Sequence, residues 1–305
     1  MKRDLIALKD YRPEEITGLL DLADELKRTR ALRDDLKGKT LALIFQKPSN
    51  RTRVSFEVGI RQLGGNCIYL GPEEINLGVR ETTADVAKTL SRYVDGLVAR
   101  TFSHKDVVDL AEHATVPVIN GLCDLYHPCQ ALADLMAIRE RFKAFQGITL
   151  AYIGDGNNVC HSLMIGCAKI GMNMKIAAPK GYEPNPAILK NAQAFAKGSG
   201  AKIEVLRKPE DAARGAQVIY ADVWVSMGQE KEAKKRLKDL KGYQINAKLA
   251  KLADPNYIFM HCLPAHRGQE VTEDVIDGPH SIIFDQAENR LHAQKAVLVA
   301  LLGKR

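Results

Sequence analysis

Short apolar segments rich in β-branched residues alternate with amphipathic segments along almost the whole chain. The apolar segments predict strands at 40–46, 67–70, 96–99, 116–119, 148–153, 175–178, 202–206, 217–220, 258–261 and 281–284. Helical periodicity predicts helices at 13–27, 52–63, 82–93, 128–142, 159–170 and 186–197. Continuous apolar strands separated by helices are typical of parallel sheets that are covered on both faces. The sequence therefore predicts an α/β fold.

The predicted strands form two groups, separated by one long helical segment at 128–146. A chain of 305 residues also exceeds a typical single domain. We therefore predict two domains, 1–127 and 147–287, each a mainly parallel sheet with helices on both faces. The segment 128–146 is the interdomain helix, and we expect the C-terminal helix 288–303 to pack back on the first domain.

The chemistry of the first domain is expected just beyond the carboxyl ends of its strands, where open parallel sheets bind ligands. The segment "SNRTR", 49–53, places Arg51 and Arg53 at the start of a predicted helix. Cations are disfavoured there by about 0.3–1 kcal/mol each, because a helix N-terminus already carries partial positive charge.

A bound anion would resolve this conflict. It would accept the free N–H groups and the hydroxyls of Ser49 and Thr52, and it would neutralise both arginines. The alternative is that Ser49 is a plain N-cap and the arginines are solvated. Arg100 and the segment 127–130 follow neighbouring strands, which favours the anion site. Phosphate is the natural candidate, and the chain has no P-loop that would indicate a nucleotide.

The second domain presents a different set of side chains at its strand ends. The segment "AYIGDGNNVCHS" begins like a dinucleotide site, but Val159 stands where the third glycine belongs, and no acid ends the next strand. Asp222 follows a strand and is suited to a cationic group. His261, Cys262 and His266 match no closed zinc pattern, so we expect no metal.

Composition and charge add little that is specific. The net charge of +7 comes largely from the lysine-rich run 231–242, which we interpret as an exposed helix. Aromatic residues are few and no arginine-rich segment is present, so we expect no nucleic-acid partner. No apolar run is long enough to span a bilayer, and we expect no membrane partner. The six cysteines form no C-x-x-C pair, which favours reduced thiols in the cytoplasm.

At these residues the chain closely resembles the aspartate/ornithine carbamoyltransferase family, over essentially its whole length. "SNRTR" resembles the family's carbamoyl-phosphate signature, Ser-Thr-Arg-Thr-Arg, and "HPCQ" resembles its His-Pro-x-Gln. "DVWVSMG" and "HCLP" are similar to the motifs of the ornithine branch, whereas the aspartate branch would carry His-Pro-Leu-Pro in place of the latter. The resemblance implies transfer of a carbamoyl group from carbamoyl phosphate to the δ-amine of L-ornithine, giving citrulline and phosphate, without a cofactor.

The resemblance also implies roles for individual residues. The first domain would bind carbamoyl phosphate through Ser49, Asn50, Arg51, Thr52, Asn76, Arg100, His127, Pro128, Cys129, Gln130 and Arg290. The second domain would bind ornithine through Asn158, Asp222, Ser226, Met227, Cys262 and Leu263. Arg100, His127 and Cys262 would be catalytic.

Two positions depart from the family pattern. Asn50 replaces the usual Thr, which we expect to be mild if that position binds through its backbone N–H. Asn76 stands where Gln is common, in a loop that would reach the active site of a neighbouring subunit. The resemblance implies homotrimers, or multiples of trimers, with active sites between subunits.

Some alternatives remain open from the sequence. Within the family, the acceptor could be putrescine or a modified ornithine instead of ornithine. Asp222 and Ser226–Gly228 favour an acceptor that carries free α-amino and α-carboxylate groups. A dinucleotide-dependent oxidoreductase and a non-catalytic phosphate-binding or nucleic-acid-binding protein are alternatives from other classes. The direction of the reaction in arginine metabolism is also open, because the same residues serve synthesis and breakdown.

Overall fold

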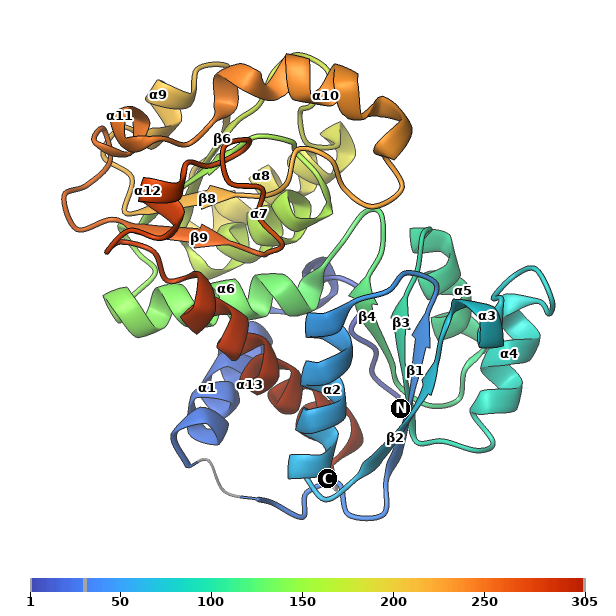
Figure 1. Cartoon of the computed structure of the whole chain (residues 1–305). Helices are drawn as coiled ribbons and strands as arrows, with labels where there is room; N and C mark the ends of the chain where they lie inside the picture. Colours follow the sequence, from blue (N-terminus) through green and yellow to red (C-terminus); the bar gives the residue numbers. More distant parts are fainter. Residues whose placement is uncertain (1, 30–31, 304–305) are drawn as a thin grey trace. The chain divides into compact units, whose positions relative to one another are not determined.

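The computed structural model describes residues 2–29 and 32–303 (Figure 1). These residues form two compact units. The first unit holds the described residues up to Met136 and those from Glu288 onward, and the second unit is Ala137–Ala287. Each unit contains one sheet in which every strand pairing is parallel. The predicted α/β fold class is confirmed.

The sheet of the first unit has four strands in the order β2-β1-β3-β4. They are β1 Thr40–Phe45, β2 Asn66–Leu70, β3 Gly96–Arg100 and β4 Val118–Leu122. The central strands β1 and β3 are buried almost throughout, as their continuous apolar sequences predict. β2 is an edge strand whose side chains are partly exposed.

Helices lie on both sides of this sheet. Figure 1 shows α1, α2 and the C-terminal helix on one side, and α3, α4 and α5 on the other. The elements are η1 Leu8–Asp10, α1 Pro13–Thr29, α2 Asn50–Gln62, α3 Pro72–Ile75, α4 Thr83–Leu90, α5 His104–His113 and α13 Ile283–Leu302.

A β-bulge interrupts the pairing of β3 with β4 near their carboxyl ends. Ala99 pairs with Asn120 but Arg100 pairs with Leu122, so Gly121 is the extra residue. A Cβ atom at Gly121 would lie 3.2 Å from Val98 Cγ1 and 3.3 Å from the Ala99 carbonyl oxygen, so the site is too tight for most side chains. Bulges redirect side chains near functional sites, and this one adjoins Arg100.

The sheet of the second unit has five strands in the order β7-β6-β5-β8-β9. They are β5 Thr149–Ile153, β6 Asn173–Ala177, β7 Ile203–Leu206, β8 Val218–Ala221 and β9 Ile258–His261. The first strand in sequence, β5, is at the centre, so the chain winds outward in both directions. One side of the sheet is rich in alanine and packs on α9, α11 and α12, with Phe259 and Ile219 fully buried there.

The remaining elements of the second unit follow the predicted alternation, with additional short helices. They are α7 Asn158–Ile170, α8 Pro186–Ser199, α9 Pro209–Ala213, η2 Glu230–Glu232, α10 Ala233–Leu240, η3 Lys241–Tyr243, α11 Ala247–Ala250 and α12 Glu273–Ile276. Among the helices of the described residues, none combines the length and the apolar character that a membrane span requires.

Two predictions about elements need correction. The helix α6 is Pro128–Phe142 and does not continue to 146. Lys143 adopts a left-handed φ of 63° and its N–H closes the last turn onto the Arg139 carbonyl, which ends the helix. The strand predicted at 281–284 is also absent. Ser281 makes one isolated bridge to Phe259, and α13 already begins at Ile283, whose side chain is buried in the core of the second unit.

Candidate functional site

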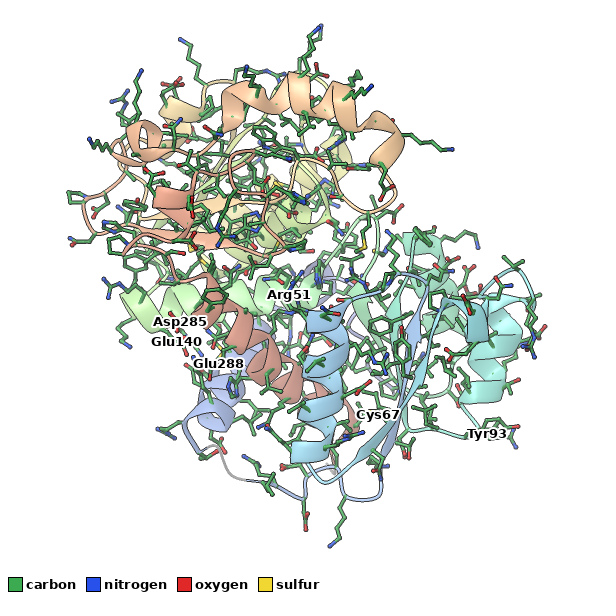
Figure 2. The ribbon with its side chains drawn as sticks, viewed as in Figure 1. Arg51, Cys67, Tyr93, Glu140, Asp285 and Glu288 are labelled. Atoms are coloured by element: carbon green, nitrogen blue, oxygen red, sulfur yellow. The ribbon has the colours of Figure 1, made fainter. Side chains whose placement is uncertain are left out.

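The start of α2 is built to receive an anion. Ser49 is the N-cap, with extended backbone (φ −165°), and its hydroxyl accepts a hydrogen bond from the Thr52 N–H at 3.2 Å. The first turn holds no acidic residue that would complement the helix dipole. Asn50 is the first helical residue, and Figure 2 shows Arg51 beside it at this end of α2. The local sequence therefore leaves positive charge for a ligand to neutralise.

Arg53, which we expected to face the same anion, has other partners. Its Nε donates to the carboxylate of Glu57 at 2.7 Å, one turn along the helix. Its guanidinium carbon also lies 3.7 Å from the ring centroid of Tyr69 on β2. From the sequence, Arg51 and Arg53 had the same expected role, whereas in the structure Arg53 is occupied by Glu57 and Tyr69.

A cluster of cations surrounds this helix start in the first unit. Burial, together with repulsion from Arg290 and Arg51, lowers the pKa of Arg100 to about 10. Arg100 is only 5% exposed, and its Nε has no hydrogen-bond partner within residues 2–29 and 32–303. A buried arginine without an acid nearby is costly unless a ligand supplies the negative charge.

His127 belongs to the same cluster. Burial and the charges of Arg290, Arg100 and Arg51 hold its pKa well below the usual value. The imidazole is therefore neutral at pH 7, and it can donate one hydrogen bond to a neutral acceptor such as a carbonyl oxygen.

Arg290 connects three of the predicted residues through its guanidinium. Its Nη1 donates to Gln130 Oε1 at 2.7 Å, and its Nη2 donates to Thr52 Oγ1 at 3.1 Å. The Gln130 amide in turn donates to Asp134 at 2.8 Å, so its orientation is fixed. Residues from α2, α6 and α13 are thus linked at one place in the first unit.

The other predicted carbamoyl-phosphate residues differ in what they can offer. Pro128 begins α6 and has no N–H to donate. The Cys129 side chain is fully buried, its thiol is directed at the Asn120 carbonyl, and burial raises its pKa to about 12. Any contribution of Cys129 to a ligand is therefore through its backbone. Asn76 lies in an exposed loop with φ 39°, a left-handed conformation that asparagine tolerates better than most residues.

In the second unit, Asp222 is the centre of the predicted site. Its Oδ1 accepts from the Val223 N–H at 2.7 Å and from the Cys262 thiol at 2.9 Å. Its Oδ2 accepts from the Asn157 amide at 2.6 Å. Asn157 also caps α7 by accepting from the Val159 and Cys160 N–H groups. Asp222 and Cys262, from the ends of β8 and β9, are therefore held together in the structure, and Asn157, which was not among the predicted residues, joins them.

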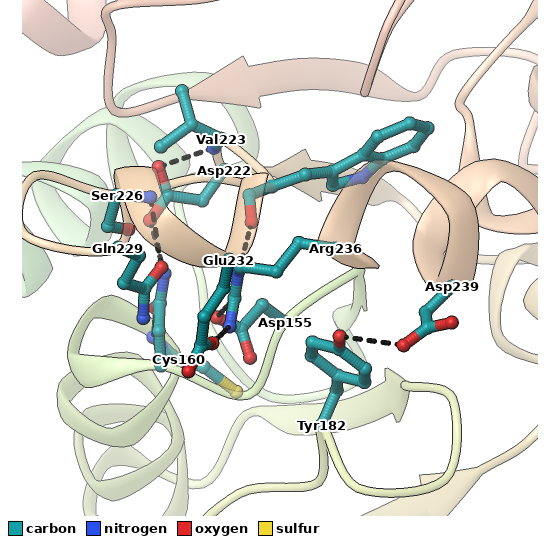
Figure 3. A network of polar contacts seen from close by, with 12 residues as sticks. Asp155, Cys160, Tyr182, Asp222, Val223, Ser226, Gln229, Glu232, Arg236 and Asp239 are labelled. Atoms are coloured by element: carbon teal, nitrogen blue, oxygen red, sulfur yellow. Dashed lines mark hydrogen bonds and ion pairs between the residues drawn. The ribbon is translucent and has the colours of Figure 1, made fainter. Parts of the chain in front are cut away.

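A buried ion pair lies next to this carboxylate (Figure 3). Arg236 on α10 pairs with Asp155 and also donates from Nε to the Trp224 carbonyl at 2.6 Å. Burial and repulsion from Asp222 raise the pKa of Asp155 to about 6, although Arg236 opposes the shift. The pair links α10 to the turns after β5 and β8.

The predicted exposed helix at 231–242 is therefore only partly exposed. Arg236 and Leu240 are buried, whereas Lys235 and Lys238 on the same helix are exposed. The turn that this helix adjoins carries Ser226, whose N–H donates to Gln229 Oε1 at 3.0 Å. Met227 in that turn is 46% exposed, so its side chain is accessible.

The glycine-rich turn after β5 has a structural explanation of its own. A Cβ atom at Gly156 would lie 2.3 Å from the Pro184 nitrogen, and the Gly156 N–H donates to the Tyr182 carbonyl at 2.8 Å. The second glycine of "GDGNN" thus allows the chain at 182–184 to cover the turn. A dinucleotide needs that space for its pyrophosphate.

Leu263 is the last of the predicted ornithine-binding residues in the second unit, and it follows His261 and Cys262 at the end of β9. Leu263 has a left-handed φ of 58°, and its N–H donates to His261 Nδ1 at 2.9 Å. Asp222, Cys262 and a ring nitrogen of His261 lie within 4.8 Å of one another, which is close enough for a metal ion. However, the thiol already donates to Asp222, and Nδ1 already accepts from Leu263.

Sequence reasoning missed Asn157, Asp155 and Arg236. An asparagine directly before a helical pattern is a recognised N-cap signal, and it would have singled out Asn157. The pairing of Asp155 with Arg236 spans about 80 residues, and neither position carries a local signal for it.

Comparison with known proteins links both units to one family. Residues 3–140 match the family described as aspartate/ornithine carbamoyltransferase, carbamoyl-P binding domain. Residues 146–301 match its Asp/Orn binding domain.

Individual relatives match along nearly the whole chain. The chain is 56% identical over 304 residues to an ornithine carbamoyltransferase of Thermococcus kodakarensis, covering 99% of this chain and 96% of that protein. It is 55% identical, with the same coverage, to an anabolic ornithine carbamoyltransferase of Pyrococcus furiosus. The structure is similar to that of an ornithine carbamoyltransferase from P. furiosus, with a TM-score of 0.96, 54% identity, and 99% and 97% of the two chains covered. It also resembles the anabolic enzyme of Campylobacter jejuni, with a TM-score of 0.94, 39% identity and 99% of each chain covered.

Proposed function

The chain belongs to the aspartate/ornithine carbamoyltransferase family, and from this we infer that it transfers the carbamoyl group of carbamoyl phosphate to the δ-amine of L-ornithine. The products are L-citrulline and phosphate. The observation that carries this conclusion is the near-complete match to relatives that are named ornithine carbamoyltransferases. Two of those relatives are described as anabolic, which supports a role in arginine biosynthesis.

We propose that the first unit binds carbamoyl phosphate with its phosphate at the start of α2. Ser49, the backbone of Asn50, and Arg51 would bind the phosphate oxygens, because a helix N-terminus offers free N–H groups and positive potential. Arg100 supports this assignment, since its buried guanidinium lacks an acid partner in the described part of the chain. Bound phosphate would relieve the repulsion among Arg51, Arg100 and Arg290.

We assign Thr52, Arg100 and His127 to the carbonyl oxygen of the carbamoyl group. Negative charge develops on this oxygen when the amine attacks the carbonyl carbon, and fixed donors lower the barrier. A neutral His127 suits this role, because it donates one hydrogen bond without adding a further cation to the cluster. Gln130, held by Arg290 and Asp134, would accept from or donate to the carbamoyl amide.

We propose that the second unit holds ornithine by its amino-acid end, through Asn158, Asp222, Ser226 and Met227. Cys262 and the carbonyl of Leu263 would orient the δ-amine. The amine attacks as the free base, the new N–C bond forms, and the C–O bond to phosphate breaks. The amine proton passes to the departing phosphate. Because the free δ-amine is a minor species at neutral pH, kcat/KM for ornithine should rise into the alkaline range.

The assembly and location are also proposals. The first unit exposes apolar side chains on α2 and the adjoining edge strand β2, with Val54 56%, Val58 38% and Ile68 51% exposed. These surfaces suit a subunit interface. We propose a trimer, or a multiple of trimers, in which Asn76 of one subunit reaches the phosphate site of the next. The six cysteines are all free thiols, which supports a cytoplasmic location. Analytical ultracentrifugation would test the trimer, and a monomer active at assay concentration would contradict it.

The test of the reaction is product formation from carbamoyl phosphate with ornithine, putrescine, N-acetylornithine and aspartate offered separately. Citrulline formed from ornithine alone is the expected result. Transfer to putrescine or N-acetylornithine would preserve the first unit's assignment and overturn the ornithine assignment of the second. No transfer to any acceptor would contradict the proposed reaction itself.

A further inference from the structure

The segment 261–271 closes on itself through two fully buried side chains, His261 and Glu270. It begins at the end of β9 and contains Cys262 and Leu263, the residues assigned above to the δ-amine of ornithine. Both side chains of the pair are 0% exposed, which is unusual for a carboxylate. Neither residue is part of the predicted site, and the transfer reaction gives no direct task to either.

The hydrogen bonds of His261 determine which of its nitrogens carries the proton. Nδ1 accepts the N–H of Leu263 at 2.9 Å, so Nδ1 is the unprotonated nitrogen of the ring. The proton then resides on Nε2, which lies 3.3 Å from Glu270 Oε1 without the alignment of a hydrogen bond, so the carboxylate attracts this proton through its charge. A carboxylate beside one ring nitrogen fixes the tautomer and leaves the other nitrogen as an acceptor, as in other histidine–carboxylate pairs.

Glu270 is held where this pairing requires it. Its Oε1 also accepts the backbone N–H of His266, in the middle of the segment. The backbone of Glu270 is anchored separately, since its carbonyl accepts from the Ile245 N–H at 2.9 Å. At the other end, the His261 N–H donates to Gln286 Oε1 at 3.0 Å. One carboxylate thus connects the start, the middle and the end of the segment.

We propose that Glu270 and His261 are positioning residues for the acceptor amine: Glu270 keeps the proton of His261 on Nε2, so that Nδ1 holds the Leu263 N–H. This bond secures Leu263 in its left-handed conformation and sets the direction of its carbonyl. The proposal rests on the proposed function, because it takes Cys262 and Leu263 to contact the δ-amine. It adds the means by which the segment is held in the productive geometry.

The first test uses the unmodified enzyme. Nitrogen-15 NMR of histidine-labelled protein reports which ring nitrogen is protonated, with a histidine variant used to assign His261. We expect protonated Nε2 and unprotonated Nδ1. A proton on Nδ1, or on both nitrogens, near pH 7 would overturn the proposal. This measurement does not depend on catalysis, so it stands whether or not citrulline is formed.

The second test uses three variants at matched positions. Glu270→Met keeps the volume and removes the acceptor, Glu270→Gln keeps an acceptor oxygen, and Glu273→Met makes the same change at an exposed glutamate on α12. In Glu270→Met we expect KM for ornithine to rise on the order of tenfold to hundredfold, with KM for carbamoyl phosphate unchanged. Glu270→Gln should recover most of the loss, and Glu273→Met should resemble the parent enzyme.

A third readout separates positioning from general support of the fold. L-Norvaline is ornithine without the δ-amine, so its inhibition constant reports binding at the amino-acid end alone. We expect norvaline inhibition of Glu270→Met to change much less than KM for ornithine. Equal losses for both ligands, or equal losses in Glu270→Met and Glu273→Met, would overturn the proposal. Absence of citrulline formation in the parent enzyme would contradict the proposed function instead. If Glu270→Met does not fold, the proposal is tested by the NMR result and by KM for ornithine in Glu270→Gln compared with the parent.

Discussion

The two units prepare their sites in opposite ways. In the first unit, burial disfavours the charged form of Arg100, and repulsion from Arg290 and Arg51 adds to this cost. In the second unit, Asp222 and Cys262 already satisfy each other within a hydrogen-bonded set. The shift of the Arg100 pKa from 12.5 to about 10 corresponds to about 3 kcal/mol against the charged form. The difference indicates that a bound anion would remove an electrostatic cost in the first unit, whereas the polar groups of the second unit are already paired with one another.

The largest expected effect is at Arg100. Arg100→Met should lower kcat by about 10²–10³-fold, because one donor to the developing oxyanion is lost. The ligand-free protein should unfold at the same temperature as the parent or higher, because a mutually repelling cation is removed. Citrulline assays and thermal unfolding with and without carbamoyl phosphate test both expectations. A ligand-free variant that melts several degrees lower would show that the first unit is not under this electrostatic strain.

The next effect separates the two arginines of α2. Arg51→Ala should raise KM for carbamoyl phosphate by about 10–100-fold, which corresponds to one charge-assisted hydrogen bond. Arg53→Ala should change it little, because Arg53 pairs with Glu57 and packs on Tyr69. Initial rates at varied carbamoyl phosphate measure both variants. Equal losses in the two would mean that the ion pair with Glu57 opens when the ligand binds.

In the second unit, Asp222→Asn should act on the other substrate. We expect KM for ornithine to rise by about 10–50-fold, since an amide replaces the carboxylate that would face a cationic group. KM for carbamoyl phosphate should remain at the parent value. Steady-state kinetics with each substrate varied separately provide the measurement. A rise in both constants would contradict the assignment of one substrate to each unit.

The smallest expected effect concerns pH and Asp155. The pKa of Asp155 in the folded protein is about 6, above the ordinary value of 3.8, so the folded state binds the proton more tightly. The stability that this contributes is present below about pH 4 and is lost as pH rises through 6. As pH rises from 4.5 to 7.5, the free energy of unfolding of Asp155→Asn should therefore increase relative to that of the parent, by up to about 3 kcal/mol.

Urea unfolding followed by the fluorescence of Trp224 measures this difference in the second unit. Trp224 is the single tryptophan of the chain and is 3% exposed in the folded protein. Lys235→Gln, at an exposed position on the same helix, is the control and should show no such trend with pH. A stability difference that is constant with pH, or that favours the parent at higher pH, would mean that Asp155 ionises normally.

The sequence predicted the order and position of the strands well, because continuous apolar segments and turn residues are local signals. The predicted strand at 281–284 was wrong because the same apolar run serves as the entry to a helix. The residues predicted for the two sites were chosen from their places after strands and from the family resemblance. Partners distant in sequence could not be predicted: Arg236 lies in a lysine-rich run that the sequence predicts to be an exposed helix, yet it pairs with Asp155 in the interior. The pairing of His261 with Glu270 likewise depends on how the segment folds back.

The first unit is not continuous in the chain, since its last helix is the C-terminal part of α13. Arg290, in this part of α13, joins Thr52 and Gln130 although it follows the whole second unit in the chain. During synthesis the second unit can therefore fold while the first still lacks this helix. A chain whose synthesis has not passed Ala287 would contain the whole second unit but not the guanidinium that joins Thr52 to Gln130. The proposed phosphate site is thus completed only after the second unit has been made.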